Sequence, residues 1–143
     1  GPADIIKAMK KIQSQSTSNP CSISQAAAVA ALNGDQSCIQ TMLKAFKERH
    51  DFVVKSVNAT PNMHCTPSDG TFYSFVNIQP FIDSRSDLST DVEVANLLLD
   101  QVGVALVPGS AFGSPGHMRL SFATSMQNLQ SAMDRINQVF SEK

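Results

Sequence analysis

The 143-residue sequence has no tryptophan, a single tyrosine and three cysteines, and only 16% of its residues are charged. Cys21, Cys38 and Cys65 are widely spaced and form no C-x-x-C pair, which argues against a disulfide framework and against a zinc site. Reduced thiols in a cytoplasmic protein fit this pattern best. The longest apolar runs are short, for example residues 26–32, so the sequence predicts no membrane-spanning helix.

The formal charge is nearly balanced, at −1 at pH 7. No run of lysine and arginine alternates with aromatic residues, so the sequence does not favour nucleic acid as a partner. His50, His64 and His117 are not at spacings typical of metal ligands, and we expect no metal site. His50 lies on an expected helix face, where packing or surface exposure is favoured over catalysis. The length and an apolar fraction of 42% suit one ordinary domain with a core.

The first 34 residues contain two expected helices and no expected strand. Residues 4–13 carry apolar side chains at helical spacing and are followed by a polar segment, QSQSTSNP, at 13–20. Asn19 and Pro20 are typical of a helix start, with Asn19 as the N-cap, and the alanine-rich helix that follows should end near Gly34. Because these helices have no layer of their own to pack on, we expect residues 1–34 to be part of another domain.

The rest of the chain, residues 35–143, alternates expected helices and strands. In order these are a long helix capped by Asp35, a strand at 71–78, a helix that begins at Ser89-Thr90-Asp91 and ends at Gly103, strands at 104–107 and 118–123, and a last helix capped by Thr124-Ser125. This order predicts an α/β fold, an α+β sandwich with helices packed on one small sheet. We place the domain boundary between Gly34 and Asp35.

Residues 102–125, VGVALVPGSAFGSPGHMRLSFATS, are the most informative part of the sequence. Arg119 lies here in an apolar run, after a loop rich in glycine, serine and proline. Because strand side chains alternate, His117 and Ser121 share one face with Arg119, and the apolar residues between them share the other. A half-buried arginine needs an anionic partner. Two partners remain open, a ligand carboxylate held by both arms of the guanidinium and a structural ion pair with a distant Asp or Glu.

Five blocks in order resemble a known family: STSNP before the alanine-rich helix, FKERHD, PSDGTFYSF, VALVPGSAFG and HMRLSFATS. They closely resemble the C-terminal part of aspartate aminotransferases, most of all the bacterial-type branch. These enzymes belong to the class I/II, fold-type I family that depends on pyridoxal 5'-phosphate. The resemblance implies that residues 35–143 are the small C-terminal domain of such an enzyme. Residues 1–34 would then be a helical remnant of the large cofactor-binding domain and a loop that faces the partner subunit.

The resemblance also implies roles for four residues. Arg119 matches the family arginine that binds the substrate α-carboxylate, and Phe72 matches an aromatic residue that walls the active-site cleft. Ser18 and Asn19 match a loop that reaches toward the neighbouring subunit's active site in the family homodimer. Residues 13–16 contain no arginine, although some family members have one in this region for the distal carboxylate of aspartate. Dicarboxylate specificity therefore stays open.

The resemblance further indicates what this chain does not contain. In the family, the lysine that forms a Schiff base with the cofactor and the residues that bind its ring and phosphate precede the matched segment. No lysine of this chain has the corresponding sequence context. We therefore expect a fragment that is inactive alone, with no catalytic or cofactor-binding residue and no bound cofactor. The full-length enzyme, completed by the missing large domain, would be a cytoplasmic homodimer that exchanges amino groups between amino acids and 2-oxo acids, of the aspartate:2-oxoglutarate type.

Two alternatives stay open at this point. One is an aminotransferase of other specificity, for aromatic amino acids, alanine or prephenate, which the absence of a distal-site arginine allows. The other is a non-catalytic module for dimerisation or ligand binding, which the missing lysine favours and the unpartnered helices of residues 1–34 disfavour.

Overall fold

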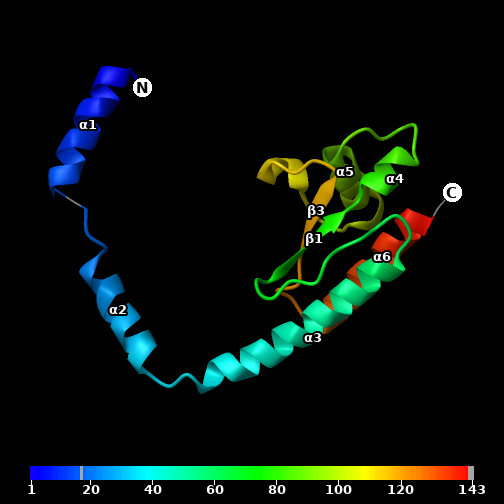
Figure 1. The fold of residues 1–143 in the computed structure, drawn as a ribbon, viewed down its shortest axis with the longest axis horizontal. Coiled ribbons are helices and arrows are strands. Elements are labelled where there is room, and N and C mark those ends of the chain that lie inside the picture. The colour runs from blue at the N-terminus through cyan, green and yellow to red at the C-terminus, as the bar shows by residue number, and fades with distance from the viewer. Residues whose placement is uncertain (17, 142–143) are drawn as a thin grey trace. The chain divides into compact units, whose positions relative to one another are not determined.

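The computed structural model describes residues 1–16 and 18–141 of the chain (Figure 1). They divide into two compact units, Gly1–Cys38 and Ile39–Lys143. Thr17 of the STSNP block and the last two residues of the expected domain 35–143 lie outside the described residues. Within the described ranges, no helix is long and apolar enough to cross a membrane. The assignment of residues 1–34 to a different domain stays a prediction.

The first unit contains helices α1 (Ala3–Ser16) and α2 (Ser22–Asn33). Helix α1 continues three residues beyond its expected end at residue 13. Its last serines fit the helix because the hydroxyls of Ser14 and Ser16 donate hydrogen bonds to carbonyl groups one turn earlier. The polar composition of residues 13–20 had indicated a loop. That expectation was wrong for residues 13–16, which are helical, while residues 18–20 lie between the two helices.

Helix α2 begins later than expected. Its N-cap is Cys21, and no side chain caps the helix. The backbone N–H of Gln25 donates to the carbonyl of Cys21, which is the first bond of the helix, and the Gln25 side chain donates to the carbonyl of Pro20. The prediction that Asn19 is the N-cap was wrong. The predicted end is confirmed, since Gly34 is the C-cap.

The second unit is built around helix α3 (Ser37–Ala59), whose N-terminus begins in the first unit. Asp35 is the expected cap of this helix, and it lies two residues before the first helical residue, Ser37. Its side chain accepts a hydrogen bond from the backbone N–H of Ser37 at 2.9 Å. Toward its C-terminus, Val53 and Val57 are fully buried in the core. The expected apolar stripe is therefore used for packing over its second half.

The remaining elements are β1 (Tyr73–Asn77), α4 (Gln79–Asp83), α5 (Asp91–Val102), β2 (Val107–Pro108), the 3-10 helix η1 (Gly109–Phe112), β3 (His117–Ser121) and α6 (Met126–Ser141). The short helices α4 and η1 were not predicted, because four or five residues carry no helical periodicity. The strand expected at 104–107 is shifted. Val104 instead completes the end of α5, where its N–H donates to the carbonyl of Leu98 beyond the left-handed Gly103.

The sheet has three antiparallel strands in the order β1-β3-β2, so β3 is central. Buried and half-buried positions alternate along β1 and β3, as expected for a sheet with one covered face. Apolar side chains of α3, α5 and α6 form one core with the buried side chains of these strands. This confirms the α/β fold with helices packed on a small sheet, and the side chains on the other face of the sheet are mostly half-buried.

Candidate functional site

The half-buried face of the sheet places Arg119 among aromatic rings. Arg119 lies at the centre of the sheet, paired with Phe75 of β1 and with Val107 of β2. Its Cζ atom lies 5.6 Å from the centroid of the Tyr73 ring and 5.2 Å from that of the Phe112 ring. The Phe75 ring in turn stacks on the ring of His117, with centroids 5.1 Å apart. We call the set formed by these five side chains the arginine face: Tyr73, Phe75, Phe112, His117 and Arg119.

Arg119 has an unsatisfied donor on this face. Its Nε atom is buried and has no hydrogen-bond partner, and among residues 1–16 and 18–141 Arg119 forms no ion pair. A buried donor without a partner costs about 1–3 kcal/mol, and more for a charged group. Of the two partners that the sequence left open, the structural ion pair is therefore absent from the described part of the chain.

The aromatic rings hold the guanidinium without using its hydrogen bonds. A cation–π contact involves the flat face of the guanidinium, while its N–H groups point outward in the plane of the group. Nε and one terminal nitrogen form an edge that matches the two oxygens of a carboxylate. The arginine face can therefore bind a small carboxylate between aromatic walls.

Phe72 adjoins this face. It comes directly before β1, is 49% exposed, and its ring meets the Tyr73 ring edge to face at 5.5 Å. Its carbonyl accepts a hydrogen bond from the backbone N–H of Phe122 at 2.8 Å. The Tyr73 ring therefore contacts two residues. One is Phe72, its neighbour in the sequence, and the other is Arg119 on the adjacent strand β3. Ser18 and Asn19 are exposed between α1 and α2, in the first unit, so the structure groups Phe72 with Arg119 and Ser18 with Asn19.

Sequence reasoning missed three members of the arginine face, Tyr73, Phe75 and Phe112. The alternation of residues 71–78 could have placed Tyr73 beside Arg119 once the pairing of the two strands was known. Phe112 lies in η1, outside any regular strand, and no pattern in the sequence indicates that its ring covers the guanidinium. The tertiary path of the loop decides that contact.

The described residues do not suit the covalent attachment of a pyridoxal cofactor. Six described lysines lie on exposed positions of helices, three on α1 and three on α3 (Lys7, Lys10, Lys11, Lys44, Lys47 and Lys55). None of them belongs to the arginine face. The described stretches also contain no cluster of three or more His, Cys, Asp or Glu side chains that could hold a metal ion.

Comparison with known proteins identifies the family. Residues 1–136 match the model of the aminotransferase class I and II family. This chain belongs to that family. The resemblance of the five sequence blocks is thereby confirmed, and members of the family depend on pyridoxal 5'-phosphate.

Individual relatives support the same assignment. The aspartate/prephenate aminotransferase of Nitrosomonas europaea is 52% identical to this chain over 146 residues, which cover 99% of this chain and 37% of the relative. The crystal structure of the aspartate aminotransferase from Rhizobium meliloti superimposes with a TM-score of 0.77 at 42% identity, over 96% of this chain and 36% of that one. The Thermus thermophilus aspartate aminotransferase with maleate matches with a TM-score of 0.75 at 34% identity, over 97% of this chain and 35% of its own. The chain therefore spans about a third of the length of these relatives.

Proposed function

We propose that the whole protein is a pyridoxal phosphate-dependent aminotransferase and that Arg119 binds the α-carboxylate of its amino-acid and 2-oxo-acid substrates. The buried Nε of Arg119, which has no partner in the described part of the chain, is the observation that carries this proposal. A substrate carboxylate would satisfy this donor through a two-point hydrogen bond. Fixing the carboxylate at two points orients the rest of the substrate for reaction, which lowers the barrier.

Phe72 is proposed as an apolar wall beside the bound substrate. Its exposure and its contact with the Tyr73 ring support this role, since Tyr73 also contacts Arg119. Ser18 and Asn19 are proposed to reach the active site of the partner subunit in a homodimer. Their exposure between two helices is compatible with such a contact.

The cofactor is proposed to bind to a part of the protein outside this chain. Pyridoxal phosphate, when bound, supplies a ring that withdraws electrons from the substrate α-carbon. The lysines described above do not fit its attachment, so the residues of this chain are proposed to bind and orient substrate only. On this view the 143-residue chain alone is inactive.

Residues 1–34 are proposed to be a strip of the large domain, and residues 35–143 the small domain. The apolar side chains of α1 and α2 are exposed, for example Ile5, Met9 and Leu32. Burial against the rest of a large domain would remove this apolar surface from water. The three free cysteines are compatible with the proposed cytoplasmic location.

The favoured substrate class is aspartate with 2-oxoglutarate. The names of the Rhizobium and Thermus relatives support this class, and maleate in the Thermus structure is a dicarboxylate. The name of the Nitrosomonas relative supports prephenate as a second acceptor. Because residues 13–16 contain no arginine, a group that binds the distal carboxylate would come from outside this chain.

The test is the Arg119→Lys variant of the full-length enzyme. Lysine keeps the charge but loses the planar two-point contact, so we expect kcat/KM to fall by at least about tenfold, the effect of about 1.4 kcal/mol. The matched control is Arg135→Lys on α6, because Arg135 donates to the carbonyl of Val102 away from the arginine face. Equal activity of the Arg119→Lys variant and the control would overturn the proposal. A substrate panel on the wild type would separate aspartate from aromatic amino acids, alanine and prephenate.

A further inference from the structure

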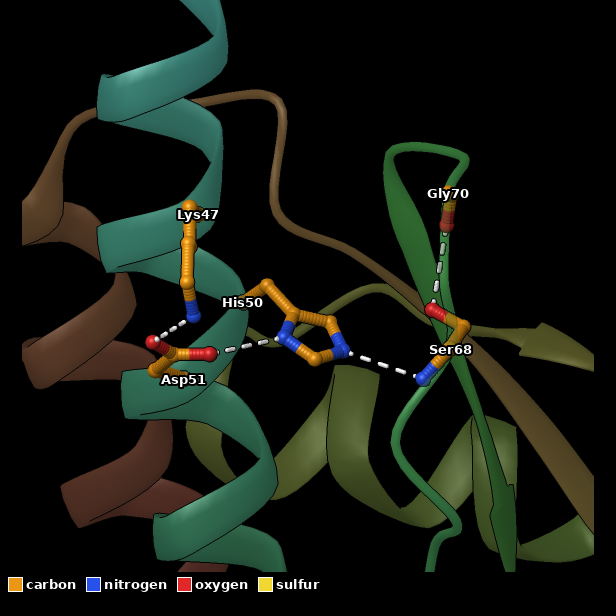
Figure 2. A network of polar contacts seen from close by, with 5 residues as sticks. All are labelled: Lys47, His50, Asp51, Ser68 and Gly70. Atoms are coloured by element: carbon orange, nitrogen blue, oxygen red, sulfur yellow. Dashed lines mark hydrogen bonds and ion pairs between the residues drawn. The ribbon is translucent and has the colours of Figure 1, made fainter.

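The imidazole of His50 joins helix α3 to the segment that precedes β1 (Figure 2). The backbone N–H of Ser68 donates to Nε2 of His50 at 3.1 Å, and Nδ1 of His50 lies 3.1 Å from Oδ1 of Asp51. Because Nε2 acts as the acceptor, the proton of the neutral ring is on Nδ1 and is donated to Asp51. Both ring nitrogens therefore have assigned roles.

The ring is also held by packing and by a second charge. Its side chain is 15% exposed and meets the buried Phe122 ring edge to face at 5.8 Å. The ammonium of Lys47 lies 2.7 Å from Oδ2 of Asp51, so Asp51 is fixed between Lys47 and His50 (Figure 2). The position of the acceptor Nε2 is therefore set by the helix.

Residues 66–71 form a turn with little support of its own. In the part of the chain that the structure describes, its one hydrogen bond to another element is the bond from Ser68 to His50. The second bond, from the Ser68 hydroxyl to the carbonyl of Gly70, is internal to the turn. Thr71 then has φ of 71°, a left-handed conformation that is strained for a β-branched residue and persists only when the surroundings impose it. The next residue is Phe72.

We propose that His50 is a positioning residue for Phe72: its neutral ring anchors the turn 66–71, and protonation at Nε2 releases the turn. The reason is that a protonated Nε2 can no longer accept the Ser68 N–H and presents a second donor to it. This inference rests on the proposed function, in which Phe72 walls the substrate site. It assigns a role to a residue outside the arginine face.

Charged groups of both signs lie around the ring. Asp51 contacts the ring directly, and Lys47 is bound to the same carboxylate. Arg49 lies over the Phe46 ring, and Asp69 lines the same cavity as His50. This cavity, of about 410 Å³, extends between α3 and the turn, which gives the released turn room to move.

The first test is nuclear magnetic resonance of this chain and does not depend on activity. We expect the neutral His50 ring to carry its proton on Nδ1, and the amide signals of Ser68 and Phe72 to follow the titration of His50. His50→Phe removes the acceptor, and exchange of the Ser68 amide should then accelerate about fivefold, the effect expected for loss of one hydrogen bond. His50→Gln offers a side-chain oxygen that does not titrate, so it should keep the protection and abolish the pH response.

Two matched controls belong to this test. Glu48→Gln changes an exposed residue of the same helix and should leave the Ser68 amide unchanged. Ser68→Ala removes the hydroxyl but keeps the N–H, so its amide should follow His50 as in the wild type. A proton on Nε2 at neutral pH, or a Ser68 amide indifferent to His50, would overturn the proposal. If His50→Phe does not fold, the proposal is tested by the pH response of the Ser68 amide in the wild type and by the absence of that response in His50→Gln.

The second test uses the full-length enzyme. We expect His50→Phe to raise KM for the amino acid about fivefold while kcat changes less than about twofold, because the wall and not the reacting group is displaced. His50→Gln should keep the wild-type KM and lose its rise at acidic pH. An unchanged KM in His50→Phe would overturn the role in positioning Phe72. Failure of the proposed function would give a different result. Arg119→Lys would then keep full activity, while the nuclear magnetic resonance measurements would still show that the Ser68 amide depends on His50.

Discussion

The carboxylate of Asp91 accepts a hydrogen bond from the backbone N–H of Ser110 at 2.7 Å. Asp91 is the first residue of α5 and is only 2% exposed, so this bond lies inside the protein. Ser110 belongs to η1, two residues before Phe112, whose ring covers the guanidinium of Arg119. The bond therefore ties α5 to the turn that carries one aromatic wall of the arginine face.

Loss of this carboxylate should destabilise the chain. Asp91→Ala leaves the Ser110 N–H without its acceptor, and we expect the free energy of unfolding to fall by about 2 kcal/mol. Asp91→Asn keeps an oxygen acceptor but loses the charge, and should cost about 1 kcal/mol. Urea denaturation of the chain measures both values. The control is Asp100→Ala, an exposed position on the same helix, and equal midpoints for Asp91→Ala and this control would contradict the assignment.

The N-terminus of α5 predicts a pH dependence of stability. Backbone hydrogen bonds from Ser89 and then Thr90 hold the pKa of the Glu93 carboxyl below its ordinary value of 4.5. A carboxyl whose pKa is lowered by folding stabilises the native state above its ordinary pKa, and this contribution is lost as the pH falls through the folded value. Unfolding measured between about pH 6 and pH 3 should therefore lose more stability in the wild type than in Glu93→Gln. Parallel pH profiles of the two proteins would refute this prediction.

Position 109 requires glycine because neighbouring atoms leave no room for a side chain, and not because its backbone angles exclude other residues. A Cβ atom there would collide with the carbonyl of Ser114 and lie 2.7 Å from the Cβ atom of His117. We expect Gly109→Ala to cost about 3 kcal/mol of unfolding free energy, at the upper end for overpacking. Gly113 has φ of 77° and open space around it, so Gly113→Ala should cost only about 1 kcal/mol of backbone strain. Thermal or urea unfolding compares the two, and a reversed order would contradict the packing argument.

Phe112 should affect substrate binding although it lies in η1 and not in a strand. Its ring contributes a cation–π interaction with Arg119, worth about 0.5–1 kcal/mol at an exposed site. In the full-length enzyme, Phe112→Leu should raise KM by about threefold, while Phe112→Tyr, which keeps the aromatic face, should stay near the wild type. Equal KM values for the leucine and tyrosine variants would show that the aromatic face of residue 112 is not needed.

The isolated chain should not attach pyridoxal phosphate at a defined lysine. The described lysines are exposed on α1 and α3, where no neighbouring group selects one of them. Incubation with the cofactor, reduction with borohydride and peptide mass spectrometry should give scattered, low labelling. No amino transfer from aspartate to 2-oxoglutarate should be detectable. Stoichiometric labelling of one lysine would overturn this prediction.

Alternation and capping made much of the second unit predictable. The alternating apolar pattern placed Arg119 on the less buried face of its strand, and the pattern Ser89-Thr90-Asp91 with Gly103 fixed α5, where Thr90 and Glu93 form a capping box. These signals are local, since each depends on residues a few positions apart. The predicted start of α2 was wrong because Asn-Pro is only a statistical preference for a helix start, and the helix instead begins after Cys21 with no side-chain cap.

The sequence by itself determined the order of the main helices and strands, which face carries the arginine and which family the blocks resemble, because strand period, helix caps and ordered motifs are written along the chain. Only the tertiary structure decided that Arg119 lacks an internal carboxylate, that Phe112 covers it, and that His50 anchors the turn before Phe72. The last two contacts join residues that are 7 and 18 positions apart, with no fixed spacing. Their geometry depends on how strands and helices pack, which no local pattern encodes.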